Sequence, residues 1–451
     1  MNRRSFLKRG LTSGTISASN LFLGSGLGLL SNLSNASSSA PSDYKTLVMV
    51  YLNGGIDSLG LIIPAGGDSY QRYRNLRQNL AFESNDLIDF GLSDYATPTF
   101  CQSMANLFQR GTLSWVSNVG PLRQPTTKAM IEQNENAMPL FIGSHNSQVI
   151  LWQSSTMDPY AREGWGGRML ELMRLPSTVI NPNISLDRSQ LYTTTLNMPS
   201  FTVNPEGVRN IPKVYDANSY PSQHSLFNDI QNETRVNLLG HEFALRNTRT
   251  IESSSELAKI LDGINSPLVT YPRVTGHTAS NFQNQLKMAA RLIESAPLLG
   301  QNRQVIMLQM HGFDTHDNQD RDLPNLVSAL FGSLEAFQTD LESRGIDNRV
   351  VTFSQSDFGR TPTINTNGTD HGWGGHQFVM GSPVNGGQMI GEVPNFDVDT
   401  DKMLHNLLIP DFSVEQYASN LARWFGLSES DILEVFPRLP NFDDIDFGLF
   451  G

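Results

Sequence analysis

The stretch KTLVMVYL at residues 45–52, followed at once by Asn53-Gly54-Gly55-Ile56-Asp57, decides the fold. A strand with one face in solvent alternates apolar and polar residues, whereas this short run is nearly continuous and contains β-branched residues. It therefore predicts a strand that is buried on both faces of a sheet. The pair of glycines that ends the run predicts a loop at the carboxyl end of that strand.

Four further apolar runs of the same kind lie at residues 113–119, 304–310, 349–354 and 377–380. Apolar residues at helical spacing predict helices at residues 281–295, 323–343 and 413–425. Strands that alternate with helices are typical of an α/β fold. We expect a three-layer sandwich in which helices cover both faces of a central, mostly parallel sheet.

One long stretch departs from this alternation. Residues 175–275 are rich in Asn, Ser, Thr and Pro and contain a helical run near 224–263. We interpret them as an insertion or cap region within a single domain that spans residues 41–451. The alternative is a long, mostly structural decoration.

The N-terminal segment has the pattern of an export signal. Asn2-Arg3-Arg4-Ser5-Phe6-Leu7-Lys8 is a twin-arginine pattern, followed by a weakly apolar stretch and small residues with cleavage options after Ala36 or Ala40. We expect residues 1–40 to direct the chain to the twin-arginine translocation machinery, which makes the mature protein periplasmic or secreted. The alternative is an ordinary basic N-terminus. No later segment reaches the ~18 apolar residues of a membrane span, so we expect none in the mature chain.

Composition excludes several classes of function. The formal net charge of the 451-residue chain is -12, and an acidic surface repels phosphate backbones, so we expect no nucleic-acid partner. The chain has one cysteine, Cys101, which excludes an internal disulfide and a cysteine-based zinc site.

Polar residues follow the predicted strands. In open α/β sheets, ligands bind outside the carboxyl ends of the strands. Five candidates stand there: Asp57, Asp314, His316, Asp357 and His371. Carboxylates and imidazoles suit one or two divalent ions such as Zn, Mn, Fe or, with fewer imidazoles, Ca. The alternatives are a structural polar rim and, for Asp57, a helix N-cap.

A second motif, Gly143-Ser144-His145, precedes a short apolar helical run. Ser144 or Ser147 caps this helix, or else Ser144 or His145 is a catalytic group at a helix N-terminus that faces the metals. Such a terminus favours an anion such as phosphate or sulfate. Arg168 and Arg360 could each hold an oxyanion through paired hydrogen bonds.

The chain resembles the DUF1501 family of exported bacterial proteins over nearly its whole mature length. The resemblance rests on the twin-arginine start, the Gly54-Gly55-x-Asp57 loop, Ser144-His145 and four further motifs: Gly164-Trp165-Gly166-Gly167-Arg168, Gly312-Phe313-Asp314-Thr315-His316, Ser356-Asp357-Phe358-Gly359-Arg360 and Thr369-Asp370-His371-Gly372-Trp373. That family is similar to the alkaline-phosphatase-like superfamily, which includes phosphatases and sulfatases.

The resemblance implies an alkaline-phosphatase-like sandwich with two metals at the carboxyl edge of the sheet. It implies that Asp57 is an early ligand, that Asp314 and His316 form a ligand pair, and that His371 is a late ligand. Asp357 stands where an aspartate–histidine pair would end a strand. Two features depart from the pattern: Phe358 replaces the expected histidine, and Asp314 and His316 are only two residues apart.

These expectations lead to a hypothesis for function. We expect an exported, metal-dependent hydrolase that acts on a small anionic ester of phosphate or sulfate. Ser144 or a water would attack, and Arg168 or Arg360 would hold the oxyanion. The alternative is a non-catalytic exported binding or assembly protein that keeps the fold and a partial metal site.

Overall fold

The computed structural model of the chain describes residues 43–176, 178–208, 217–232, 238–397 and 400–451. The predicted twin-arginine segment and its cleavage region lie outside the described residues, so export stays a prediction. None of the helices in the described ranges combines the length and the apolar character that a membrane crossing requires.

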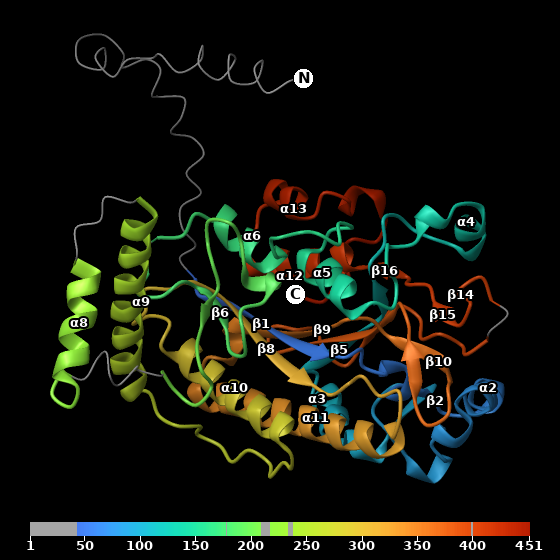
Figure 1. The fold of residues 1–451 in the computed structure, drawn as a ribbon. Helices are drawn as coiled ribbons and strands as arrows, with labels where there is room; N and C mark the ends of the chain where they lie inside the picture. Colours follow the sequence, from blue (N-terminus) through green and yellow to red (C-terminus); the bar gives the residue numbers. More distant parts are fainter. Residues whose placement is uncertain (1–42, 177, 209–216, 233–237, 398–399) are drawn as a thin grey trace, which may run out of the picture. The chain divides into compact units, whose positions relative to one another are not determined.

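A central sheet of nine strands, counted over the described residues, organises the fold (Figure 1). Its order is β13-β5-β12-β9-β1-β8-β6-β7, with β16 paired to β5. The strands are β1 (Lys45–Asn53), β5 (Leu113–Gly120), β6 (Asn183–Ser185), β7 (Phe201–Thr202), β8 (Arg303–His311), β9 (Val350–Ser356), β12 (Gly375–Met380), β13 (Met389–Ile390) and β16 (Phe412–Ser413). All five predicted strands are therefore present.

The sheet is mostly parallel, as expected. β1 lies at its centre and pairs in parallel with both β8 and β9. The exception is β12, which is antiparallel to both of its neighbours, β5 and β9. The carboxyl ends of β1, β8 and β9 consequently meet at one edge.

Side chains of β1 point alternately to two separate cores. Leu47, Met49 and Tyr51 belong to one, and Val48, Val50 and Leu52 belong to the other. The first core is covered by α5 (His145–Ser154), α6 (Trp165–Leu172), α12 (Val414–Phe425) and α13 (Glu429–Val435). The second is covered by α3 (Gln102–Gln109), α10 (His277–Glu294) and α11 (Gln319–Arg344). Figure 1 shows these two helical layers on opposite sides of the sheet, which confirms the predicted sandwich.

The predicted C-terminal helix begins and ends as its sequence indicates. Ser413 is the N-cap of α12 and forms a capping box with Gln416. Gly426 ends the helix in the left-handed conformation, with φ 107°.

The stretch 175–275 is partly a component of the sheet. β6 pairs with β8, and β7 pairs with β6, so these two short strands extend the sheet at its edge. Two helices follow, α8 (Pro221–Asn232) and α9 (Leu238–Asp262), which lie side by side in Figure 1. α9 buries Leu257 and Leu261 in the second core. A capping role for the two helices stays a prediction.

Smaller elements frame the carboxyl edge. The most important is an antiparallel hairpin in which Arg360 of one strand is paired with His371 of the other. The hairpin is formed by β10 (Arg360–Ile364) and β11 (Thr369–His371). The others are α2 (Gly67–Arg77), α4 (Lys128–Gln133), β2 (Ile63–Pro64), β3 (Leu87–Asp89), β4 (Tyr95–Pro98), β14 (Met403–Leu404) and β15 (Leu407–Leu408).

Candidate metal centre

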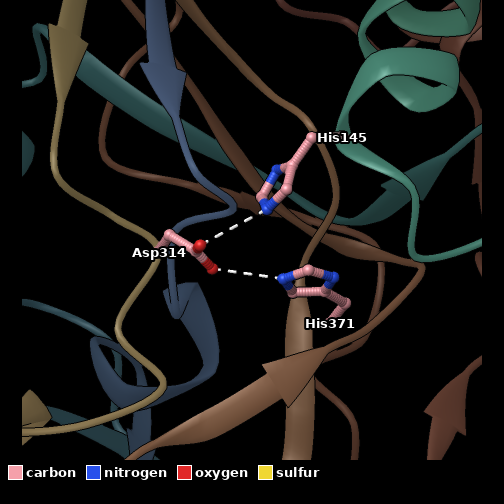
Figure 2. A group of neighbouring side chains, drawn as sticks. All are labelled: His145, Asp314 and His371. Atoms are coloured by element: carbon pink, nitrogen blue, oxygen red, sulfur yellow. Dashed lines mark hydrogen bonds and ion pairs between the residues drawn. The ribbon is translucent and has the colours of Figure 1, made fainter.

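Four side chains from three segments converge at the carboxyl edge of the sheet. Asp314 and His316 lie in the loop after β8, His371 ends β11, and His145 begins α5. Nε2 of His371 lies 3.1 Å from Oδ1 of Asp314, and Nε2 of His316 lies 3.2 Å from the same atom. Nε2 of His145 lies 3.5 Å from Oδ2 of Asp314. Figure 2 shows His145 and His371 turned toward this carboxylate. We call the four residues the donor cluster.

The opposite ring nitrogen of each histidine is held by an oxygen atom. The Nδ1 contacts are His145 to Asp357 at 2.5 Å, His316 to Asp370 at 3.2 Å and His371 to the carbonyl of Gly143 at 2.6 Å. A carbonyl can only accept, and ionised carboxylates only accept too, so each Nδ1 carries the hydrogen. Three Nε2 lone pairs are thereby directed into the cluster. The same arrangement orients histidines that bind metals.

The spacing of the donors fits a divalent ion. Nε2 of His316 and Nε2 of His371 lie only 2.8 Å apart. Two facing lone pairs at this distance repel each other unless a proton or a cation lies between them. Nε2 of His145 is buried and makes no hydrogen bond to any described residue. The ligand atoms of His145, Asp314 and His371 all lie within 4.8 Å of one another, close enough to share one divalent ion, and His316 adjoins this group through His371.

Asp357 takes a different place from the one expected of a ligand. Its side chain is buried, and its two oxygens accept hydrogen bonds from Tyr51 at 2.5 Å and from His145. The hydrogen bond to Asp357, with the negative charge of that residue, raises the pKa of His145 against the effect of burial. Burial, with the adjacent Asp357 charge, raises the pKa of Tyr51 well above its ordinary value, so its hydroxyl stays a donor. Asp357 therefore orients His145 instead of joining the cluster.

Asp57 is also placed outside the cluster. Arg77 of α2 donates to its two oxygens at 2.5 and 2.8 Å, and Nε2 of Gln319 donates to Oδ2 at 2.6 Å. Asp57 and Arg77 are both buried. Because the negative charge is matched by a guanidinium, the geometry gives Asp57 a structural role in place of the expected one. Asp57 does occupy the N-cap position of a short 3-10 helix, Ser58–Gly60, which was the alternative for it, but its side chain makes no capping hydrogen bond.

Arg360 is buried and fully engaged, which corrects its expected role as an oxyanion holder. Its guanidinium donates to four carbonyls and to Oδ1 of Asp314 at 2.5 Å; the carbonyls belong to Gly54, Gly55, Phe313 and Thr369. Burial opposes ionisation of Asp314, but its hydrogen bond to Arg360 and the charge of that residue prevail and lower its pKa. Arg360 thus fixes the loops and Asp314.

Arg168 and Ser144 lie near opposite ends of α5. Arg168 donates to the carbonyl of Ser154 at 2.5 Å, at the carboxyl end of the helix. That end is roughly 14 Å from His145 along a helix of this length, so the structure does not bring Arg168 to the cluster. Ser144 occupies the N-cap position, as expected, but its side chain makes no capping hydrogen bond.

Phe358 forms a wall of the cluster. Its ring centroid lies 4.9 Å from that of His145 and 4.5 Å from that of His371. It also fills the space beside Gly55, where a Cβ atom would come within 2.5 Å of the ring. The residue that replaces the expected histidine therefore packs against two donors.

The sequence motifs predicted that Asp314, His316, His371 and His145 lie together, but not which residues hold these side chains and Asp57 in place. Asp370 precedes His371 directly and could have been noticed as a partner for a histidine. Arg77 and Gln319 carry no such signal, because nothing in the sequence places them beside Asp57.

No curated protein matches the sequence. Solved structures that are similar include Ps i-CgsB in complex with k-i-k-neocarrahexaose, at 9% identity over 89% of this chain and 77% of that chain, with a TM-score of 0.38. PsFucS1 sulfatase from Pseudoalteromonas sp. is 9% identical over 89% and 71%, with a TM-score of 0.34. Wild-type alkaline phosphatase PafA is 12% identical over 71% and 64%, with a TM-score of 0.30.

At these TM-scores the similarities carry no argument about chemistry. The family comparison is stronger, because the model described as "Protein of unknown function (DUF1501)" matches residues 44–435. This match covers most of the chain and includes every residue of the donor cluster. The protein therefore belongs to the DUF1501 family.

Proposed function

We propose that the protein is a metal-dependent hydrolase of phosphate or sulfate esters, acting on a small anionic substrate. One observation carries this proposal: three imidazoles, each with its Nδ1 held by an oxygen, direct Nε2 toward the carboxylate of Asp314. Unpaired lone pairs at this spacing are costly unless they bind an ion. Centres of this composition are common in hydrolytic enzymes.

The donor set favours some ions over others. His145 and His371 supply nitrogen and Asp314 supplies oxygen, and His316 adds a third imidazole beside them. Zn, Mn and Fe accept such a set, whereas Ca prefers six to eight oxygen donors. When bound, an ion of this kind supplies Lewis-acid polarisation of an ester oxygen.

The residues of the chain prepare the site around the ion. Arg360 holds Asp314, and Asp357 holds His145, so two donors are fixed before a substrate arrives. The first turn of α5 begins beside the cluster, and free backbone N–H groups at a helix start favour an anionic group. Ser144, whose hydroxyl is not used as a cap, is our candidate for the attacking group, with a water as the alternative.

We also propose that the protein acts in the periplasm or beyond. The support is the twin-arginine pattern Asn2–Lys8 with its downstream small residues. Replacing Arg3-Arg4 by Lys-Lys is expected to leave the full chain in the cytoplasm, as cell fractionation would reveal. An unchanged distribution contradicts export by this route.

The first experiment is elemental mass spectrometry on the full chain, purified without chelator and supplied with Zn, Mn or Fe. We expect about one equivalent of metal, lost in Asp314→Ala/His371→Ala. His277→Ala, at an exposed histidine outside the cluster, is the matched control and should retain the metal. The loaded protein is then screened with p-nitrophenyl phosphate and p-nitrophenyl sulfate. Absence of metal from the wild-type chain would sink the proposal.

A second function has a specific observation in its favour. Phe358 fills the place of an expected donor and Arg77 neutralises Asp57, so the residues that the structure describes do not offer the second set of ligands that the superfamily resemblance implies. A non-catalytic binding or assembly protein with one metal would have this composition. It predicts that metal binds but that neither ester is hydrolysed, and that Ser144→Ala changes nothing.

A further inference from the structure

A polar groove lies alongside the donor cluster. Its volume is about 540 Å³, and it is lined by the ends of β1 and β8, the segment after β6 and the start of α5. This is the carboxyl edge of the sheet, where open α/β folds bind their ligands. The donor cluster itself does not form its lining.

Four carboxamides give the groove its chemistry: Asn53, Asn146, Gln190 and Gln309. A carboxamide offers two N–H donors and a carbonyl acceptor, which matches a hydroxyl group that donates and accepts at once. Gln190 donates to Gln309 at 3.0 Å, so these two side chains are arranged as a pair. Asn146 is exposed on the first turn of α5.

The charges of the groove are few and nearly balanced. Arg188 and His311 are the ionisable side chains among its described lining residues apart from Tyr51. Both lie close to Asp187, at 3.2 Å from Arg188 Nε and 3.6 Å from His311 Nε2. Because the positive charge has a partner, the groove does not need a multiply charged ligand.

Apolar side chains also line the groove. Val149 and Ile150 of α5 are partly exposed there, and the ring of Tyr51 contributes beside them. A ligand that has a carbon framework and also hydroxyl groups matches this mixed lining. Ring polyols have this amphipathic form.

The groove is connected to the donor cluster by two short links. Asn146 directly follows His145 in α5. Tyr51 lines the groove and donates its hydroxyl to Asp357, whose other oxygen holds His145. A molecule in the groove can therefore present one end to the cluster.

We infer that this groove binds the polyhydroxylated, uncharged alcohol part of the ester, with the phosphate or sulfate group toward the donor cluster. The inference rests on the proposed function for the reacting group only. Recognition of the polyol depends on the carboxamides and requires no metal.

The test is a binding measurement on the full chain with methyl α-glucoside and methyl β-galactoside, compared with cyclohexanol, a ring of similar size with one hydroxyl. Saturation-transfer NMR titrations give the affinities. We expect at least one glycoside to bind more tightly than cyclohexanol, and Asn146→Ala/Gln190→Ala to weaken that binding by tenfold or more. Asn136→Ala/Gln124→Ala, at exposed positions outside the groove, is the matched control. The single variant Asn146→Ala, at an exposed site, guards against loss of folding.

Two results overturn the inference: equal glycoside affinity in the wild-type chain and the groove variant, or no preference over cyclohexanol. Metal content and turnover are measured in parallel, so the two proposals fail separately. If a chain that holds no metal binds glycoside through the groove, the inference about the groove stands and the proposed hydrolase function is rejected. The opposite outcome is that the chain hydrolyses p-nitrophenyl esters but the groove variant leaves the KM for glucose 6-phosphate or glucose 6-sulfate unchanged. In that case the proposed hydrolase function stands and the inference about the groove is rejected.

Discussion

Two aspartates at the same edge of the sheet have opposite surroundings. Asp57 follows β1, is 1% exposed and is paired with Arg77, whereas Asp314 follows β8, is 47% exposed and faces three imidazoles. Both positions are where a ligand is expected from the order of strands alone. The difference lies in the charge around each carboxylate. The charge of Asp57 is balanced by Arg77 without any ion. The imidazole lone pairs of the donor cluster, by contrast, face the carboxylate of Asp314.

The comparison shows that position at a strand end is insufficient to identify a metal ligand. A cationic side chain that arrives from elsewhere removes the need for an ion. Arg77 does so for Asp57, and Arg360 takes up only one oxygen of Asp314. We therefore expect substitutions at the buried pair to affect stability and substitutions at the donor cluster to affect binding.

The largest effect is expected for Arg77→Met. Removing the guanidinium leaves Asp57 as a buried, unpaired charge, which costs about 3–5 kcal/mol of unfolding free energy. Urea denaturation measures the loss. Asp57→Leu/Arg77→Met, which removes both charges, should recover most of it. A loss below about 1 kcal/mol, or metal that disappears in Asp57→Asn while Asp314 is intact, would break the comparison.

The next effect is a pH dependence of the unfolding free energy, caused by a buried histidine near Asp57. The backbone N–H of His376 donates to Ser58, the residue after Asp57, and burial lowers the pKa of His376 to about 4. The unfolded chain takes up a proton near pH 6.5 and the folded chain only near pH 4. Stability from this group is therefore complete above pH 6.5 and is lost as the pH falls toward 4, by up to about 3 kcal/mol. Urea denaturation between pH 7 and 4 should show a shallower loss in His376→Asn than in the wild-type chain. Parallel curves would contradict this assignment.

Asp357→Asn tests the donor cluster through a residue that holds one of its histidines. The substitution keeps the volume but weakens the hydrogen bond that orients His145. Affinity for metal is expected to fall 10–100-fold, as for other residues that support a metal-binding histidine. Competition with a chelator gives the affinity. Asp370→Asn, at an exposed partner of His316, should have a smaller effect. Equal losses of metal affinity in the two variants would contradict the larger role assigned to Asp357.

The smallest effect is expected for the stability of the metal-free chain in His316→Ala. The side chain is 41% exposed, so its removal should change the unfolding free energy by less than ~0.5 kcal/mol. Metal content should nevertheless fall. A large loss of stability without metal would mean that the donor cluster is a structural network like the buried pair.

Sequence reasoning predicted much of the fold because it rests on local periodicity. β1 and the middle of β8 are nearly continuous apolar runs, and β5 and β9 combine apolar and β-branched residues with a few small polar ones. The reversed direction of β12 was not foreseen. It has a local cause, since a hairpin and not a helix connects β9 to β12, and a parallel return normally needs a helical crossover.

The site was predicted less completely. The motifs at 311–316 and 369–371 gave three of the four members of the donor cluster as ligands, and His145 was placed at the start of a helix with another role. Asp57 and Asp357 were expected to be ligands as well. Their true partners, Arg77 and Tyr51, come from elements whose positions depend on the complete tertiary structure.

The separation of the partners along the chain sets an order during synthesis. Asp57 and Arg77 are 20 residues apart, so their pairing is available once the first fifth of the polypeptide has left the ribosome. The donor cluster joins residue 145 to residues 314 and 371, and its last member is translated only when about four fifths of the chain has been made. The buried charge of Asp57 can thus be paired with Arg77 early in synthesis. The proposed metal site, by contrast, has no complete set of donors until synthesis is nearly finished.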